Sequence, residues 1–498
     1  MGYMGVDVGT SGCKAVVFDN DGRQLAAAYR EYDLITTDQG GAELDSRAVM
    51  RKCLEVIGQS ATAAGRGTVR GIGISSQGEA FTAVDHKGNP LTNGMVSSDV
   101  RSLPYVEQWV PRFGAERLYN ITGHTAHPMF TLFKILWLRD RQPAVWNRAD
   151  KFLCYEDLLQ AHLGLDPAIG WPLAGRTMLF DVRQHAWQED ILAAVGLRPE
   201  QLARPLASGT VVGTIPGDIA RDLGLGAGAS VVTAGHDQPC GALGAGVTSP
   251  GMAMYATGTV ECITPVFAAP VFTEELRRSN LCTYDHAMPG MYVTAAFSLT
   301  GGNILKWFRD EFGAHEVAAA EATGSSAYER LLRAASPKPT SLLVLPYFTP
   351  SGTPYFDTRT KGAILGLSLS TQRGEILRAL LEGVAFEMRL NLDILARSGC
   401  PIQELRAIGG GAKSKFWTQL KADILGTPIT TLHVHEAGCL GAAMLARAAD
   451  TGEPVTELAS RWVQPAADCT PNPATTGYYD ERFALYRQLY PALKEIPV

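Results

Sequence analysis

Residues 6–14 read VDVGTSGCK, and they join two segments whose composition is typical of β-strands. Residues 3–8 and 14–19 are β-prone runs that share this polar turn, and a hairpin signal at residues 20–22 leads into a third run at residues 24–29. A dinucleotide-binding or P-loop fold would enter a helix after the first loop, and neither GxxxxGK[ST] nor GxGxxG occurs here. The chain therefore opens as three strands joined by two turns.

Strands and helices alternate through the rest of the first half. An amphipathic pattern predicts a helix over residues 46–64, and the β-prone run 69–75 ends in SSQGE. A later β-prone run at residues 230–233 is followed by AGHDQPCGALGAG at residues 234–246. This alternation indicates an α/β domain.

A second α/β half begins at residue 252, again with a strand, a Thr-Gly-Thr turn and a strand. A chain of 498 residues is too long for one typical core, so two large domains are expected. The echo of the N-terminus predicts domains of related design over residues 1–247 and 248–498, facing each other across a cleft. Residues 481–493 read as a short helical tail that closes the chain.

Composition is that of a globular protein and argues against nucleic-acid binding. Hydrophobic residues make up 46% and charged residues 19% of the chain, as in an ordinary globular protein. The net charge of −6 arises from interspersed acids and bases, so no basic face is implied and nucleic acid is not expected as a partner.

The cysteines and the N-terminus bear on the compartment. Nine cysteines are scattered without a CxxC pair, which argues against a disulfide framework and a zinc cluster. The N-terminus lacks the basic leader of a signal peptide, and no apolar run approaches the ~18 residues of a membrane span. We therefore expect a cytoplasmic protein that does not cross a membrane.

Asp7 stands inside an otherwise apolar strand, just before the Gly-Thr-Ser turn. A buried acid is costly unless it is paired or binds a metal. The turn exposes N–H and hydroxyl groups that suit phosphate oxygens. The structural alternative is a hairpin turn whose aspartate accepts backbone hydrogen bonds.

Asp237 follows a predicted strand within Gly235-His236-Asp237-Gln238. Strand ends are where α/β proteins place ligands, and a carboxylate there could accept a proton from a hydroxyl that receives a phosphoryl group. His236 and Gln238 would orient it or bind the acceptor. The alternative is that Asp237 only caps the following helix.

Three further loops follow predicted strands and carry small or hydroxyl residues. They are Thr257-Gly258-Thr259, Ser298 to Gly302 before a helix with Trp307, and Gly409-Gly410-Gly411-Ala412-Lys413-Ser414. Such loops let backbone N–H groups approach an anion or a flat adenine. Each alone is ordinary turn chemistry, but together they indicate a nucleotide site.

At this point the chain resembles the FGGY family of carbohydrate kinases over nearly its whole length. The matching motifs, in the family's order, are VDVGTSGCK, SSQGE, SSDVR, YNITGH…KILW, RTMLFD, GHDQ, TGT, TGGNILKWFRD, LPYFTPSGTPYFD, GAILGL…LLEGVAFE, GGGAKSKFWTQLKADILGTPI and EAGCLGAAMLA. The resemblance implies a two-domain actin-like, or ribonuclease H-like, α/β fold that closes over ATP and sugar. It also implies Mg2+ as a cofactor, and a homodimer is common in the family.

The resemblance carries over to individual positions. Asp237 matches the catalytic base, and Asp7 matches the acid near magnesium. Positions that match ATP-binding ones are Thr10, Ser11 and Lys14 in the first phosphate loop, Thr259 and Gly302 at the phosphates, and Gly410, Gly411 and Ser414 at the adenosine. Positions that line the sugar side in relatives are Gln77, Glu79, Asp99, Arg101 and Gln238.

Three residues depart from the family pattern, and the first two concern the substrate. Ser97 replaces the usual tryptophan, and Gly78 stands where glycerol kinases carry an arginine. The GER-T-P pattern reads Gly352-Thr353-Pro354 without its arginine, which leaves catalysis untouched. The methionine–histidine pair of many xylulose kinases is also missing.

The expected reaction is transfer of the ATP γ-phosphoryl group to a hydroxyl of a small open-chain sugar, with a ketopentose such as xylulose as first candidate. A fuculose-type deoxy-ketose or a polyol such as a pentitol is the alternative substrate. An actin-like ATP-binding switch protein and a sugar sensor without turnover are the alternatives from other classes. The switch would not explain the polar, sugar-sized set of residues, and the sensor would not explain an intact Asp237.

Overall fold

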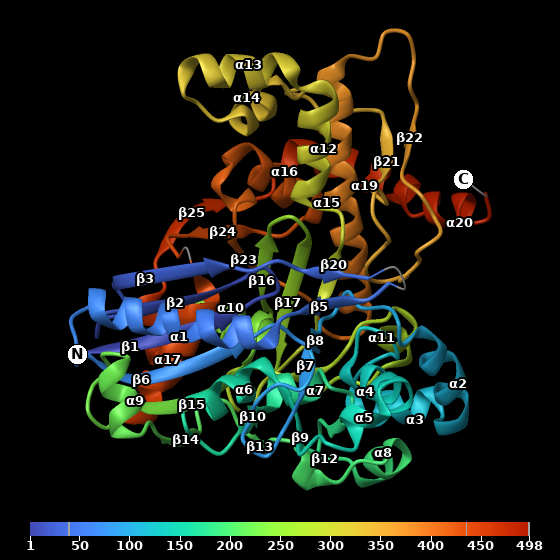
Figure 1. Cartoon of the computed structure of the whole chain (residues 1–498). Helices are drawn as coiled ribbons and strands as arrows, with labels where there is room; N and C mark the ends of the chain where they lie inside the picture. Colours follow the sequence, from blue (N-terminus) through green and yellow to red (C-terminus); the bar gives the residue numbers. More distant parts are fainter. Residues whose placement is uncertain (38–39, 435, 497–498) are drawn as a thin grey trace.

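A six-stranded sheet in the order β14-β15-β6-β1-β2-β3 forms the centre of the N-terminal half in this computed structural model, which describes residues 1–37, 40–434 and 436–496 (Figure 1). Its strands are β1 Gly2–Val8, β2 Gly12–Phe18, β3 Gln24–Glu31, β6 Val69–Ser76, β14 Val211–Thr214 and β15 Ser230–His236. Helix α1 (Ser46–Ala63) packs against β2 and β3. The strand-turn-strand opening, the first helix and the strand before SSQGE are thus confirmed.

A larger sheet forms the centre of the C-terminal half. Its order is β18-β19-β17-β16-β23-β24-β25, and β20 also pairs with β17. The strands are β16 Met252–Thr257, β17 Glu261–Phe267, β18 Tyr284–Asp285, β19 Tyr292–Val293, β20 Ala296–Ser298, β23 Glu404–Ile408, β24 Ile429–Leu432 and β25 Pro465–Cys469. The helices α12 (Gly302–Phe312), α15 (Arg373–Arg397), α16 (Lys415–Leu425) and α19 (Pro473–Tyr486) accompany this sheet (Figure 1).

The two sheets share one pattern. The hairpin β1–β2 is antiparallel, and β1, β6 and β15 run parallel to one another. In the second sheet the hairpin β16–β17 is antiparallel, and β16, β23 and β24 run parallel. The internal echo expected from the sequence is therefore present, and the parallel strands bring their loops to one edge of each sheet.

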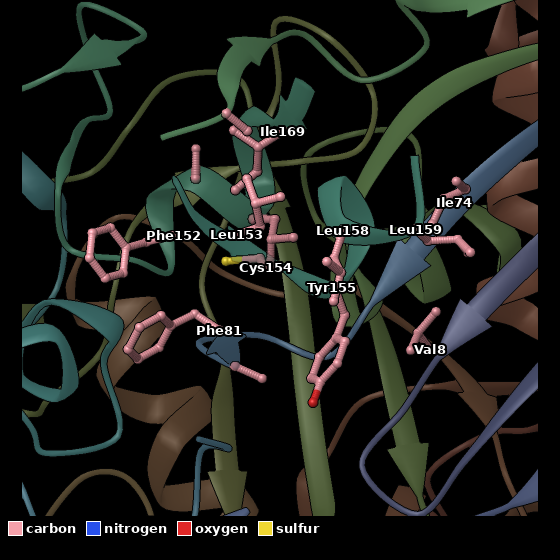
Figure 2. Close-up of a cluster of buried hydrophobic side chains, with 14 of the residues drawn as sticks. Val8, Ile74, Phe81, Phe152, Leu153, Cys154, Tyr155, Leu158, Leu159 and Ile169 are labelled. Carbon is pink, nitrogen blue, oxygen red and sulfur yellow. The ribbon is translucent and has the colours of Figure 1, made fainter. Parts of the chain in front are cut away.

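Buried apolar side chains pack the N-terminal sheet against helix α6 and a smaller sheet. Figure 2 shows Val8 of β1 and Ile74 of β6 in the same cluster as Leu158 of α6 (Tyr155–His162). Phe81 and Phe152 lie 6.4 Å apart between ring centroids, in the smaller sheet that adjoins this cluster. That sheet has the order β4-β5-β8-β7-β9, with bounds Ile35–Thr36, Ala42–Leu44, Gly94–Met95, Phe81–Val84 and Lys151–Cys154.

Helix α17 (Ala437–Thr451) belongs to the C-terminal half of the sequence but packs on the N-terminal sheet (Figure 1). A Cβ on Gly5 of β1 would lie 1.8 Å from the carbonyl oxygen of Cys439, and one on Gly73 of β6 would lie 2.0 Å from that of Ala442. Only glycine permits this approach of helix and sheet. The strands of the N-terminal sheet precede residue 247 and those of the C-terminal sheet follow it. Because α17 follows residue 247 in the sequence but packs on the N-terminal sheet, the domain limits 1–247 and 248–498 remain a prediction.

The remaining elements complete the two halves. In the first they are α2 Leu103–Phe113, α3 Ala115–Thr122, α4 Thr131–Arg141, α5 Pro143–Trp146, α7 Trp171–Gly175, α8 Glu189–Val195, α9 Gly217–Asp222, β10 Ala168–Gly170 paired with β13 Arg204–Leu206, and β11 Phe180–Asp181 paired with β12 Ala186–Trp187. After residue 236 they are α10 Asp237–Gly244, α11 Glu274–Arg278, α13 Ala314–Thr323, α14 Ala327–Ala334, β21 Leu343–Leu345 paired with β22 Ala363–Leu365, α18 Val455–Trp462 and α20 Leu489–Leu493. The predicted tail corresponds to α19 and α20. Among the described residues, none of the helices has the length and apolar character needed to cross a membrane.

Candidate functional site

The β1–β2 turn holds the first predicted phosphate loop. Thr10 and Ser11 are exposed at its tip, whereas the Gly9 N–H donates to the Gly12 carbonyl at 3.0 Å and is engaged within the turn. The Thr10 hydroxyl donates to Gln77 Oε1 at 3.0 Å, and Gln77 Nε2 donates to the Gly9 carbonyl at 3.0 Å. Gln77, which we expected on the sugar side, therefore braces the phosphate loop with its amide.

Asp7 lies at the end of β1, beneath this turn. Its Oδ1 accepts a hydrogen bond from the Ser75 hydroxyl at 3.1 Å. Desolvation, and then the negative charge of Asp237, raise the pKa of Asp7 to about 7, while Ser75 and Lys14 act in the opposite direction. An acid so close to its protonation point needs a nearby cation to stay ionised at neutral pH.

Lys14 of the first phosphate loop forms an ion pair with a residue of the C-terminal half. Its Nζ lies 2.5 Å from Oε2 of Glu436, the residue that precedes α17. A Cβ on Gly438 would lie 3.5 Å from Asp7 Oδ2, so the first turn of α17 lies against the Asp7 carboxylate. The sequence predicted Lys14 but not Glu436, because the two are 422 positions apart.

Asp237 is the first residue of α10, directly after β15. Ser76 of β6 pairs with Val8 on one side and with His236 on the other, so Asp7 and Asp237 lie at the same edge of the sheet. No hydrogen bond to the Asp237 carboxylate is found within the described part of the chain, and the buried atoms Asp237 Oδ1 and Gln238 Oε1 lack partners. Helix capping therefore does not account for Asp237.

Glu156, which the sequence analysis missed, holds the strand end that carries Asp237. Its Oε1 accepts from the N–H groups of Ala234 and Gly235 at 2.9 and 3.1 Å, and its Oε2 accepts from the Gly170 N–H at 2.9 Å. The side chain is fully buried. Three backbone donors on one carboxylate fix the backbone immediately before His236 and Asp237.

Replacing this carboxylate should loosen the strand end. In Glu156→Gln the amide NH2 group would face at least one backbone N–H, which leaves a buried donor unsatisfied at a cost of about 1–3 kcal/mol. We expect a lower midpoint of denaturant-induced unfolding together with reduced turnover. Glu189→Gln, which alters an exposed acid in the first turn of α8, is the control and should match the wild type in both measurements.

Glu79 is buried and paired on the expected sugar side. Its Oε1 forms an ion pair with Arg176 (Nε–Oε1 2.5 Å), and its Oε2 accepts from the Ser97 hydroxyl at 2.7 Å. Desolvation alone would raise the pKa of Glu79, but Arg176, followed by His236, more than offsets it and the pKa is lowered. Ser97, which replaces a tryptophan of the family, thus serves as a donor to this carboxylate, and Arg176 is a residue that we did not single out.

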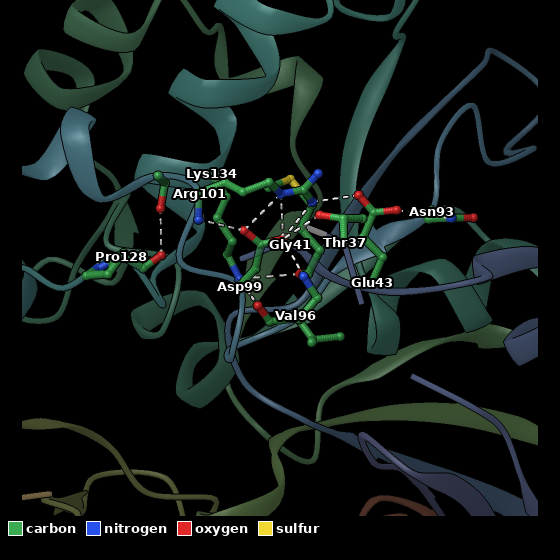
Figure 3. A network of polar contacts seen from close by, with 12 residues as sticks. Thr37, Gly41, Glu43, Asn93, Val96, Asp99, Arg101, Pro128 and Lys134 are labelled. Carbon is green, nitrogen blue, oxygen red and sulfur yellow. Dashed lines mark hydrogen bonds and ion pairs between the residues drawn. The ribbon is translucent and has the colours of Figure 1, made fainter. Parts of the chain in front are cut away.

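Asp99 and Arg101 bind each other. Figure 3 shows Arg101 between Asp99 and Glu43, with Nη2 at 2.6 Å from Asp99 Oδ2 and 2.5 Å from Glu43 Oε1. Asp99 Oδ2 also accepts from the Ala42 N–H at 3.0 Å, and the Arg101 guanidinium lies 4.3 Å from the centre of the Trp137 ring. These contacts join the loop of Asp99 and Arg101 to β5 and α4, and they occupy the groups that we expected to line the substrate.

Lys134 connects this loop to Glu79. Its Nζ donates to the Val96 carbonyl at 3.1 Å (Figure 3). It also donates to the carbonyls of Glu79 and Met95 at 2.9 and 3.3 Å. Burial lowers the pKa of Lys134 to about 8, against the attraction of Glu79 and Asp99. A fully buried lysine with three carbonyl partners fixes the backbone around Glu79.

The C-terminal half contributes the second turn. Gly258 and Thr259 are exposed between β16 and β17. The N–H groups of Gly302 and Asn303 at the start of α12 donate to the carbonyls of Gly258 and Thr259 at 2.8 and 3.1 Å. The expected Gly302 N–H is therefore engaged here, and it holds the Thr259 turn in place.

The glycine loop after β23 lies beside that turn. A Cβ on Gly411 would lie 2.9 Å from Thr257 Oγ1, whereas one on Gly410 would meet nothing within 4 Å. Ser414 accepts from the Trp417 N–H at 3.3 Å and caps α16. Gly410 is thus open toward solvent, as a site for a flat base requires, while Ser414 is used as a helix cap.

A buried ion pair supports the same turn from below. Lys421 Nζ of α16 lies 2.8 and 2.9 Å from the two carboxylate oxygens of Glu261, and both side chains are buried. The Lys421 ammonium also lies 4.7 Å from the Tyr255 ring centre and 4.2 Å from that of Trp417. No local sequence pattern predicts this pair, because its members are 160 positions apart.

The arrangement brings together a subset of the predicted residues. Asp7, Thr10, Ser11, Lys14 and Gln77 lie around one turn, and Asp237 and Gln238 lie at the same sheet edge. Thr259, Gly302, Gly410 and Gly411 lie around the corresponding turn of the second sheet. The exposed hydroxyls of Thr10, Ser11 and Thr259 at two such turns suit phosphates. The Asp237 carboxylate and Gln238 Oε1, without hydrogen-bond partners among the described residues, suit the O–H groups of a polyhydroxylated molecule.

Comparison with known proteins gives consistent results. A model of the N-terminal domain of the FGGY family of carbohydrate kinases matches residues 2–244, and the model of its C-terminal domain matches residues 253–449. Over 504 residues the chain is 28% identical to a xylulose kinase of Staphylococcus epidermidis, covering 99% of this chain and 97% of that one. It is 30% identical to a glycerol kinase of Methylibium petroleiphilum over 89% of each chain.

A solved structure shares the whole architecture. The crystal structure of a xyloylose kinase from Brucella ovis superposes with a TM-score of 0.89 at 27% identity, covering 99% of both chains. The two-domain actin-like α/β fold expected from the sequence is thereby confirmed.

Proposed function

Because the chain belongs to the FGGY family of carbohydrate kinases and is a sugar kinase, we propose that it transfers the γ-phosphoryl group of ATP to a hydroxyl of a small open-chain sugar. The observation that carries this proposal is the Asp237 carboxylate, which stands at a strand end with no hydrogen-bond partner among the described residues. An acceptor hydroxyl next to it would lose its proton to this carboxylate as the bond to phosphorus forms.

The phosphate-binding role is proposed for groups that other contacts leave available. Thr10 and Ser11 on one side and Thr259 on the other are exposed at the two turns. Lys14 supplies positive charge that Glu436 partly balances, and Gly302 positions the Thr259 turn. Gly410 and Gly411 would accept the adenosine beside the same turn, with Ser414 as the cap that orders their loop.

Magnesium would supply charge neutralisation on the β- and γ-phosphate oxygens. The described residues contain no group of three side chains spaced to hold a metal ion, so the phosphates and water would provide most ligands. Asp7 fits the protein's side of such a site, because burial and the nearby Asp237 carboxylate raise its pKa and a bound cation would offset both.

Asp7→Asn should raise the magnesium concentration for half-maximal rate by on the order of tenfold and lower the maximal rate. The neutral amide keeps the shape and the Ser75 contact but no longer attracts the cation. Magnesium titrations at saturating ATP measure this. Asp19→Asn removes an acid at the far end of β2 and is the control; an identical titration for both variants would contradict the role of Asp7.

On the sugar side, Gln238 is proposed to face the substrate, and Gln77, Glu79, Asp99 and Arg101 to hold the surrounding backbone. A ketopentose such as xylulose is the first candidate because the relatives include a xylulose kinase. A fuculose-type deoxy-ketose or a pentitol is the alternative. We also propose that the protein is cytoplasmic and forms a homodimer.

A panel of ketoses, polyols and aldonates with a coupled ADP readout tests the function. Sugar-dependent ADP release with one member supports a kinase, and the same assay without sugar measures basal hydrolysis. ADP release that no sugar stimulates would favour the actin-like switch and overturn the proposal.

A further inference from the structure

The His236 imidazole lies between Asp237 and a tyrosine of the other half of the chain. Its Nδ1 is 3.0 Å from the hydroxyl oxygen of Tyr284, on strand β18, and its Nε2 is 3.1 Å from Asp237 Oδ1. Tyr284 is fully buried and only 6% of His236 is exposed. The imidazole therefore has protein groups at both nitrogens.

The carboxylate beside Nε2 favours one tautomer of His236, and the Tyr284 hydroxyl is compatible with it. Burial raises the pKa of Tyr284 well above its usual value, so its hydroxyl keeps the proton and can donate it to Nδ1. Nε2 then carries the ring hydrogen, and Asp237 Oδ1 lies 3.1 Å from this nitrogen. In the other tautomer the Nε2 lone pair would face that oxygen, which is repulsive.

The contact with His236 differentiates the two oxygens of Asp237. Oδ1 is buried and lies near Nε2, although outside hydrogen-bond alignment, while 30% of the Asp237 side chain is exposed. The exposed part therefore lies away from Oδ1. A base needs one oxygen held by the protein and the other presented to the acceptor hydroxyl.

Gly78 leaves the space in which His236 sits. A Cβ at position 78 would lie 2.8 Å from His236 Nε2 and 3.0 Å from its Cδ2. Any side chain there would push the imidazole from its place between Tyr284 and Asp237. The observed position of the His236 imidazole therefore requires glycine at position 78.

We propose that His236 and Tyr284 are positioning residues for Asp237, and that Gly78 is required because it admits the His236 imidazole. Tyr284 holds the His236 ring through Nδ1, and His236 lies against Oδ1 so that the other oxygen of Asp237 faces the substrate. Because Tyr284 comes from the second sheet, the orientation of the base depends on contact between the two halves of the chain. This inference rests on the proposed role of Asp237 as the base.

The first test compares two tyrosine variants. Tyr284→Phe should lower kcat by about tenfold, the loss that one orienting hydrogen bond represents, and leave the KM for ATP unchanged. Tyr119→Phe is the matched control, because its buried hydroxyl donates to the Leu281 carbonyl at 3.0 Å, away from His236. Both variants lose one buried hydroxyl, so their unfolding midpoints should shift alike while only Tyr284→Phe loses kcat.

The second test uses amides as partial replacements. His236→Gln can place an N–H near the position of Nε2 and should retain more kcat than His236→Asn, whose amide reaches only the position of Nδ1. Gly78→Ala should lower kcat in the wild type but have no further effect in His236→Ala, since the displaced imidazole is already absent.

The outcomes separate this inference from the proposed function. If the wild type shows no sugar-dependent turnover, the proposed function fails and the inference with it. If the wild type is active but Tyr284→Phe equals Tyr119→Phe, or Gly78→Ala acts equally in both backgrounds, only the inference is overturned.

Discussion

Asp237→Asn should lose turnover by on the order of 10³-fold while it still binds nucleotide, because the amide cannot accept the proton of the sugar hydroxyl. The substitution keeps the shape of the side chain at the start of α10, where no hydrogen bond to the carboxylate is found among the described residues. It also removes a negative charge near Asp7 and the expected phosphates. A coupled ADP assay measures the rate, and titration calorimetry measures nucleotide binding.

The control for this prediction is another aspartate in the first turn of a helix. Asp218 is exposed in the first turn of α9, so Asp218→Asn removes the same favourable interaction with a helix N-terminus. It should leave the rate unchanged. A rate for Asp237→Asn within tenfold of the wild type would exclude Asp237 as the base.

Lys421→Met should have the largest effect on stability. It leaves the Glu261 carboxylate buried without its cation, and breaking a buried ion pair in this way costs about 3–5 kcal/mol. Gly301 packs against the backbone and side chain of Glu261, and Thr259 lies two residues before Glu261 in the sequence. Because a displaced Glu261 would disturb the Thr259 turn, the KM for ATP should rise as well. Denaturant-induced unfolding and ATP kinetics measure the two effects.

The double variant Lys421→Met/Glu261→Met provides the internal control. Replacing both partners by apolar side chains of similar length removes the uncompensated charge, and such replacements are often close to neutral. The double variant should therefore unfold later than Lys421→Met. Equal unfolding of the single and double variants would show that the ion pair is not the source of the effect.

The sequence predicted elements whose signals are local. The hairpin β1–β2 and helix α1 were found from alternation, turn residues and periodicity, and their observed bounds differ by only a few residues. Strand β15 was predicted to end at residue 233 but continues to His236. It does so because pairing with β6 resumes after an irregularity at Thr233 and Glu156 binds the N–H groups of Ala234 and Gly235.

The partners of the site residues could not be predicted in the same way. Asp237 and Asp7 were predicted because they stand at strand ends in two motifs, GHDQ and VDVGTSGCK, that match the family, although each alone could be a cap or turn acid. Arg176 and Glu436 begin two of the matching motifs, RTMLFD and EAGCLGAAMLA, but the motifs do not reveal that the topology brings these residues to Glu79 and Lys14. Asp99 and Arg101 matched positions on the sugar side of relatives, but matching positions do not reveal that their charged groups bind each other.

Helix α17 has a consequence for how the protein is made. The last strand of the N-terminal sheet ends at His236, but the helix that packs on this sheet is complete only at Thr451. At synthesis rates of ~5–20 residues per second, the ribosome needs roughly 10–40 s to deliver it. During that interval the nascent N-terminal half has no native cover for the apolar side chains that α17 buries. The N-terminal sheet can therefore complete its packing only when about nine tenths of the chain has been synthesised.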